Sequence, residues 1–122
     1  MIRLVTPADR QTVEYPDGVW RSAAVSRETT GNETLFVAVS GAPSGAPPTP
    51  PHHHGDCETA LYMLRGRMRF RFGEGLREHV EAGPGDVLYL EPNTVHVEQS
   101  LTPDEPVEVL IIRTKPPEVT FV

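Results

Sequence analysis

Apolar and polar residues alternate along several short windows of this chain, and no window keeps apolar residues at the spacing of three and four that an amphipathic helix requires. The same windows are rich in Val, Leu, Ile, Phe and Tyr, which favours β-strands. The predicted strands, with ends placed to within about 2 to 4 residues, are residues 19–26, 34–40, 59–64, 67–72, 77–81, 87–90, 95–99 and 106–113. The pattern therefore predicts an all-β protein.

Turn-forming residues separate these windows, for example Asp17-Gly18 and the run GPGD at 83–86. Such regular punctuation predicts a sandwich or a barrel. The run GAPSGAPPTPP at 41–51 holds five of the 13 prolines, so it forms neither an interior strand nor a helix. We interpret it as a stiff extended lead-in to the residues that follow, with a linker between domains as the alternative.

The chain has 122 residues, which suits one domain spanning residues 1–122 with a single core. Its first residues, MIRLVTPADR, lack the apolar stretch of a signal peptide, and no run of about 18 apolar residues exists to span a membrane. We therefore expect a soluble protein with no membrane partner and a cytoplasmic location. The single cysteine, Cys57, fits a reducing compartment; it is interpreted as a loop thiol without a role, with a metal ligand as the alternative.

The formal net charge is −6, which argues against a nucleic-acid partner. Five of the 11 basic residues nevertheless fall within one short stretch, namely Arg65, Arg67, Arg69, Arg71 and Arg77. In the run RMRFRF at 67–72 the arginines alternate with apolar residues, so they share one face of a strand. We interpret that face as a solvated outer surface rather than as a strip for an anionic ligand.

The run PHHHGDCE at 51–58 contains candidate metal ligands. His52 and His54 are two positions apart, so in an extended segment their side chains leave the same face. Glu58 follows after a turn signal, and two imidazoles with one carboxylate suit iron, manganese, nickel, copper or zinc. A further ligand would be His79 or His96; His96 is preferred because it follows a proline turn at a strand, whereas His79 lies in a charged run. The alternative is a histidine cluster in a loop with no function.

Two runs carry a family resemblance. The run HHHGDCE, which ends at Glu58, has the form H-x-H, three residues, Glu, with Gly66 further on. The run GDVLYLEPNTVH, which ends at His96, has the form G-D, a short apolar strand, a proline turn and His. In this order they resemble the two motifs of the cupin superfamily. Seven residues rather than the family's six separate Glu58 from Gly66, so either a β-bulge after Glu58 restores the alternation or Thr59 takes the place of the acid.

The resemblance implies a double-stranded β-helix, or jelly-roll barrel, that encloses one small-molecule substrate. It also implies one divalent transition metal ion per chain, with Fe(II) favoured and manganese, nickel or zinc as alternatives. The implied ligands are His52, His54, Glu58 and His96. Tyr62 and Tyr89 fall on or near strands that would line the barrel, where a hydroxyl orients a substrate, although core packing is the preferred interpretation. Family habit further predicts a homodimer.

The functional hypothesis that follows from the resemblance is a metal-dependent enzyme acting on a small oxygenated molecule such as an enol, a diketone or a phenolic compound. A dioxygenase-like oxidoreductase is the leading form, in which Glu58, as the catalytic residue, releases from the metal to shuttle a proton. One alternative is a non-redox cyclase, isomerase or lyase similar to polyketide cyclases, with the metal only as a Lewis acid. The other is a non-catalytic module that binds or senses a small ligand.

Overall fold

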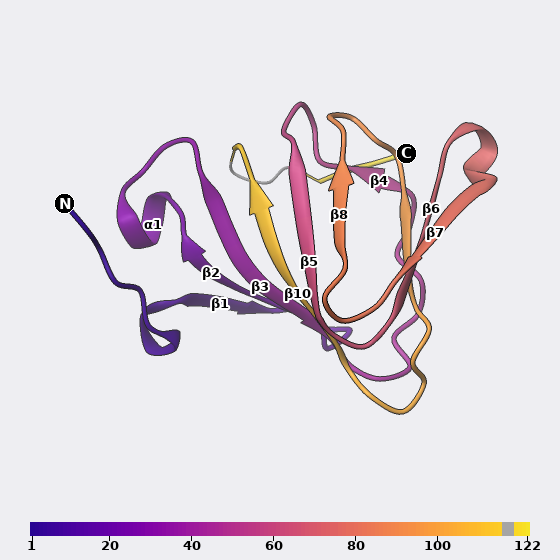
Figure 1. The fold of residues 1–122 in the computed structure, drawn as a ribbon, viewed down its shortest axis with the longest axis horizontal. Coiled ribbons are helices and arrows are strands. Elements are labelled where there is room, and N and C mark those ends of the chain that lie inside the picture. The colour runs from indigo at the N-terminus through magenta and orange to yellow at the C-terminus, as the bar shows by residue number, and fades with distance from the viewer. Residues whose placement is uncertain (116–118) are drawn as a thin grey trace.

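The computed structural model describes residues 1–115 and 119–122, and almost all of its regular structure is β-strand (Figure 1). The larger sheet has six strands in the order β1-β2-β3-β10-β5-β8, and each neighbouring pair is antiparallel. The bounds of these strands are β1 Gln11–Glu14, β2 Trp20–Val25, β3 Phe36–Ala42, β10 Val107–Arg113, β5 Thr59–Arg65 and β8 Val87–Leu90.

The second layer is a smaller sheet in the order β7-β6-β9, with bounds Glu78–Ala82, Met68–Phe72 and Val97–Ser100. Strand β4 (His52–His53) pairs with β11 (Thr120–Phe121), and a bridge between His52 and His96 joins β4 to the start of β9. In Figure 1 the hairpin of β6 and β7 stands at the right, and β4 lies between it and β8. The predicted double-stranded β-helix is confirmed.

Each predicted strand window overlaps an observed strand, with ends that differ by up to two residues, whereas β1, β4 and β11 were not predicted. All four residues of β1 are exposed, and β4 and β11 are two-residue strands paired with each other. The sequence pattern also did not predict three short helices, namely η1 (Pro7–Asp9), α1 (Arg27–Thr30) and η2 (Glu74–Leu76). Caps define α1: the Ser26 hydroxyl accepts the Thr29 N–H, and Gly31 ends the turn with a φ of 76°. Among the described residues, no helix is long and apolar enough to cross a membrane.

The core lies between the two sheets and follows the alternation of the strands. On β10 and β5 every second residue is buried, namely Val107, Val109, Ile111, Arg113, Thr59, Leu61 and Met63. Phe70 of β6 and Ala82 of β7 pack against this face from the other sheet. The inner face of the two central strands is therefore apolar except at Thr59 and Arg113, which lie opposite each other in the ladder.

The arginine run on β6 faces outward, as the alternation predicts. Phe70 is buried, while Arg67 and Arg71 are exposed. Arg69 forms an ion pair of 2.6 Å with Glu81 on the neighbouring β7. Such a pair on the protein surface contributes only about 1 kcal/mol or less. Since Arg67 and Arg71 are exposed, the strip is a solvated outer face.

Candidate metal centre

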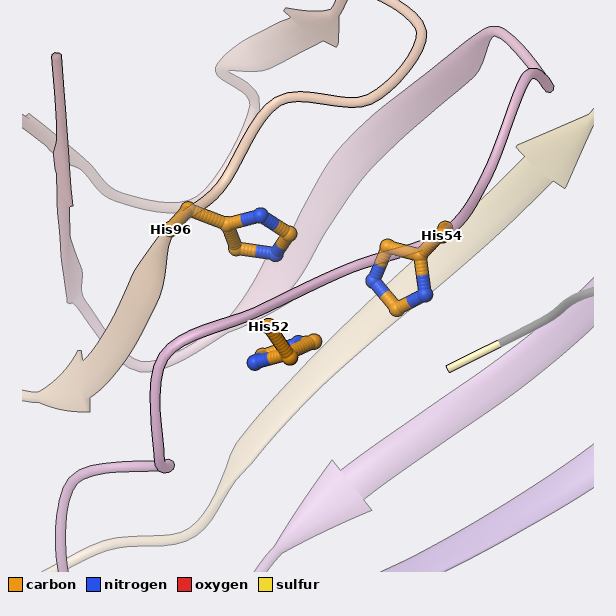
Figure 2. Close-up of side chains that lie close together, drawn as sticks. All are labelled: His52, His54 and His96. Carbon is orange, nitrogen blue, oxygen red and sulfur yellow. The ribbon is translucent and has the colours of Figure 1, made fainter. Parts of the chain in front are cut away.

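Three histidines converge at one end of the barrel. His52 and His54 come from β4 and the residue that follows it, and His96 comes from the residue before β9. One ring nitrogen from each lies within 4.8 Å of the other two. Figure 2 shows the three rings gathered around a common space, with His52 and His54 on one segment of chain and His96 on another.

Backbone pairing brings the two segments together. The His52 N–H donates to the His96 carbonyl at 3.1 Å, and the His96 N–H donates to the His52 carbonyl at 2.9 Å. The extended backbone then places His52 and His54 on the same side, while the His53 ring turns away and accepts the Gly55 N–H at 3.1 Å. The predicted convergence of His52, His54 and His96 is therefore present in the fold. His79 lies on the exposed strand β7, outside this cluster.

Carbonyl groups fix the orientation of two of the rings. His52 Nδ1 lies 2.7 Å from the Pro50 carbonyl, and His96 Nδ1 lies 2.8 Å from the Thr94 carbonyl. A ring nitrogen that faces a carbonyl carries the proton, so Nε2 of each neutral ring offers its lone pair. Pro50 belongs to the proline-rich segment before the histidines, so this segment also fixes the orientation of the His52 ring.

The cluster fits a divalent transition metal ion. His96 is 1% exposed, and its buried Nε2 has no hydrogen-bond partner among the described residues, although the Glu98 carboxylate lies 3.4 Å away. A buried nitrogen without a partner costs about 1–3 kcal/mol, and a metal ion would satisfy it. Three neutral imidazoles also match the nitrogen ligands that iron, manganese, nickel and zinc accept.

The structure does not bring Glu58 to the histidines. Its side chain is exposed, and its carboxylate accepts a 2.7 Å hydrogen bond from the Tyr89 hydroxyl. The reason is the alternation of β5: Thr59 is 2% exposed on the inner face, so its neighbour Glu58 faces outward. The pairing of β5 with β8 is regular from Thr59 onward, and the irregularity in β5 lies at its far end, opposite Glu108. Thr59 therefore occupies the inward position that an acid would need.

Glu98 is the carboxylate that lies beside the cluster, and the sequence analysis missed it. Its Oε1 is 3.4 Å from His96 Nε2. Burial alone raises the pKa of the Glu98 carboxyl, but the contact with His96 and the nearby imidazoles of His52 and His54 outweigh burial and lower that pKa. Burial likewise lowers the pKa of His96, and the contact with Glu98 outweighs it and raises that pKa. The signal was present in the sequence, because His96 and Glu98 are two positions apart on one strand.

A cavity of about 480 Å³ opens inside the barrel beside the histidines. Its wall is largely apolar and includes Leu61, Met68, Phe70, Val109 and Ile111. His54 and Glu98 also line it, so a molecule held there reaches the candidate metal centre. A cavity of this size with few polar groups is typical of a site for one small molecule.

Tyr62 and Tyr89 do not line this cavity. Both side chains are exposed on outward positions, paired opposite Val87 and Ala60 across β5 and β8. Core packing, the preferred interpretation of these tyrosines, is therefore wrong. Tyr89 instead borders a second pocket of about 300 Å³, which His96 also touches.

Cys57 is buried, and its thiol lies 3.2 Å from the His54 carbonyl. Its sulfur is not among the converging ligand atoms. This contact helps to hold the turn that follows His54.

Fold and site together define a small β-barrel protein with a histidine cluster suited to a metal ion. The Cupin domain family matches residues 38–113, which is more than half of the chain, and the chain therefore belongs to the cupin family. None of the curated proteins matches it.

Solved structures share this fold over nearly the whole chain. The polyketide cyclase RemF from Streptomyces resistomycificus is 20% identical with a TM-score of 0.78, and the match covers 100% of this chain and 86% of the cyclase. A cupin-like protein from Thermotoga maritima is 24% identical with a TM-score of 0.68, covering 96% of this chain and 84% of that one. Oxalate decarboxylase from Lactobacillus farciminis is 18% identical with a TM-score of 0.78, covering 94% of this chain but only 34% of the decarboxylase.

Proposed function

We propose that the protein is a metal-dependent enzyme acting on a small oxygenated molecule such as an enol, a diketone or a phenolic compound. The observation that carries this proposal is the buried Nε2 of His96, which has no hydrogen-bond partner among the described residues, lies 3.4 Å from the Glu98 carboxylate and converges with His52 and His54 beside an apolar cavity. A nitrogen in that position is suited to a metal ion, and the adjoining cavity is suited to a substrate that reaches it.

The roles of the chain's own residues follow from their positions. His52, His54 and His96 would hold the ion, oriented by the carbonyls of Pro50 and Thr94. The bound ion would supply Lewis acidity and, with a redox-active metal such as Fe(II), one-electron chemistry. The apolar wall excludes water from the reacting molecule, which strengthens electrostatic contacts inside the site.

Glu98 is the proton acceptor that we assign. Its carboxylate lies on the cavity side of the wall, beside His96, where it can take the proton of an enol or a phenol as that group is bound. Glu58, the acceptor that the family resemblance implies, has its carboxylate on the outer side with Tyr89. The role of proton shuttle therefore passes to Glu98 in this proposal.

Dioxygenase-like chemistry is the leading reaction, and a non-redox cyclase, isomerase or lyase is the second candidate. The second candidate is favoured by the fold similarity to a polyketide cyclase that matches over the full length of this chain. The same three histidines serve either reaction, because the metal decides between electron transfer and Lewis acidity. The homodimer and the cytoplasmic location stay predictions.

The test combines metal analysis with oxygen uptake. Protein purified without added metal is analysed for its metal content, then loaded with Fe(II), Mn(II) or Zn(II) and given acetylacetone or catechol. Consumption of dioxygen that depends on Fe(II) or Mn(II) supports the dioxygenase-like reaction. Zinc held tightly without oxygen consumption excludes that reaction in favour of the second candidate. Failure to bind any of these metals at micromolar concentration contradicts both.

A further inference from the structure

A buried positive charge lies in the barrel wall without an acidic partner. Arg113 ends β10 on the inner face and is 5% exposed. Its Nε donates to the Thr59 hydroxyl across the ladder at 3.2 Å. Among the described residues no carboxylate lies within ion-pairing distance of its guanidinium, and Thr59 is its only hydrogen-bond acceptor. Arginine is rarely buried unless it is paired, because the uncompensated charge is costly.

A second arginine faces the same cavity. Arg21 of β2 lies with its guanidinium 5.7 Å from the centre of the Phe36 ring, and Phe36 is the partner of Arg113 in the ladder of β3 and β10. Both arginines line the cavity of about 480 Å³ that reaches His54. Two cationic side chains, on the strands β2 and β10 that flank β3, thus border one interior space.

The acidic groups around this cavity form no direct ion pair with the arginines among the described residues, although the charge of Glu98 acts on Arg113 from a distance. The ionisable residues that line it are Tyr15, Asp17, Arg21, His54, Glu98 and Arg113. Asp17 is exposed, and its carboxylate accepts the Val19 N–H in its own turn. Glu98 is engaged with His96 at 3.4 Å. The two arginines and the two carboxylates that line the cavity balance formally, but in the described part of the chain neither arginine has a carboxylate within ion-pairing distance.

We propose that Arg113, with Arg21, forms a carboxylate-binding subsite in the cavity, so that the molecule bound there is a small organic acid. The carboxylate accepts hydrogen bonds from the Arg113 guanidinium, which is fixed along its Nε edge by Thr59. The carbon skeleton lies along the apolar wall, and the oxygenated end points toward the histidines. That last placement rests on the proposed function, whereas the carboxylate contact does not require a metal.

Physical chemistry favours a carboxylate at this position. A guanidinium is planar and binds a carboxylate with paired hydrogen bonds, and such charged contacts are stronger away from water. The apolar wall beside the arginines suits the hydrocarbon part of the same molecule. A neutral molecule of equal shape would leave the Arg113 charge buried and unpaired.

The first experiment compares two probes of matched shape on metal-free protein. Benzoate carries a carboxylate, and benzamide replaces it with a neutral amide. Their dissociation constants are measured by NMR titration on the wild type, on Arg113→Met and on Arg71→Met, a control on the exposed outer face of β6. We expect benzoate to bind the wild type and Arg71→Met about tenfold or more tightly than benzamide. In Arg113→Met the preference falls to about one. Equal affinities in the wild type, or a preference that survives in Arg113→Met, overturn the proposal.

A second measurement covers the case in which Arg113→Met does not fold. In the wild type, the side-chain Nε–H signals of Arg113 and Arg21 are followed by NMR as benzoate is added. Saturable shifts of both signals with benzoate, and none with benzamide, support the subsite. Shifts confined to arginines on the outer face of β6 contradict it.

The same titration on protein loaded with Zn(II) separates this proposal from the proposed function. If the protein binds no metal but still binds benzoate through Arg113, the carboxylate subsite is supported and the proposed metal-dependent function is contradicted. If the protein binds metal tightly but shows no preference for benzoate over benzamide, the carboxylate subsite is contradicted and the proposed metal-dependent function is not.

Discussion

Glu58 faces outward just before β5 of the larger sheet, whereas Glu98 faces inward on β9 in the smaller sheet, although each follows closely after a histidine of the cluster. Glu58 comes four residues after His54 and ends outside, where its carboxylate accepts a hydrogen bond from Tyr89. Glu98 comes two residues after His96 and ends inside, 3.4 Å from His96 Nε2. The inward position next to Glu58 belongs to Thr59. Strand alternation, rather than closeness in sequence, therefore decides which acid meets the histidines.

The largest effect is expected from His96→Ala, which removes a candidate metal ligand from the interior of the barrel. We expect the affinity for Zn(II) or Mn(II), measured by calorimetry, to fall at least about a hundredfold, since even residues that only support a metal ligand contribute 10- to 100-fold. His79→Ala is the matched control, because His79 lies on the exposed β7. Unchanged metal affinity in a folded His96→Ala protein would contradict the assignment of the three histidines as a metal centre.

The division between the inner and outer faces of the larger sheet is tested at two isoleucines that are adjacent on β10. Ile111 is 7% exposed and packs in the core, whereas Ile112 is 38% exposed on the outer face. We expect Ile111→Ala to lower the free energy of unfolding in urea by about 2–5 kcal/mol, and Ile112→Ala to lower it by about 1 kcal/mol or less. Similar losses in the two variants would mean that β10 does not divide inside from outside as described.

The comparison of the two acids is tested directly by Glu98→Gln and Glu58→Gln. Glutamine keeps the shape of the side chain and removes the charge. We expect Glu98→Gln to weaken metal binding about 10- to 100-fold, because the carboxylate beside His96 no longer offsets the charge of the ion. Glu58→Gln should change the affinity less than about twofold, since a charge exposed to water is screened. A larger loss in Glu58→Gln than in Glu98→Gln would reverse the assignment.

Much of the fold was readable from the sequence, because alternation and turn residues are local signals. The strand at Val87–Leu90 appears with its predicted bounds. His96 was separated from His79 by its context after a proline turn, and the structure brings only His96 to the other two histidines. The very short strand β4 was missed because its existence depends on pairing with β11 and His96, which are far along the chain.

The acidic and basic residues of the interior were harder to predict. The spacing of His96 and Glu98 shows that they share a face, but only the fold shows that this face is the inner one. Arg113 stands at the end of the apolar run VEVLIIR, where an arginine is easily taken for the exposed end of a strand. Its burial is set by its ladder partners Thr59 and Phe36 on both sides. Such lateral contacts between strands distant in sequence leave no local pattern.

The smallest expected effect concerns Tyr89, which reports on the outer side of the wall. Its hydroxyl donates to the Glu58 carboxylate, and this hydrogen bond, more than burial or nearby charge, raises the pKa of Tyr89. The contact stabilises the neutral phenol, so its contribution to stability is present below the ordinary tyrosine pKa of about 10 and is lost as the pH rises through the raised value. In Glu58→Gln the pKa of Tyr89 should fall back toward its ordinary range, measured by the ultraviolet absorbance of tyrosinate with Tyr89→Phe to assign the signal. Metal loading should leave this titration unchanged if Glu58 stays outside, whereas a metal-dependent shift would show that Glu58 turns inward to the ion.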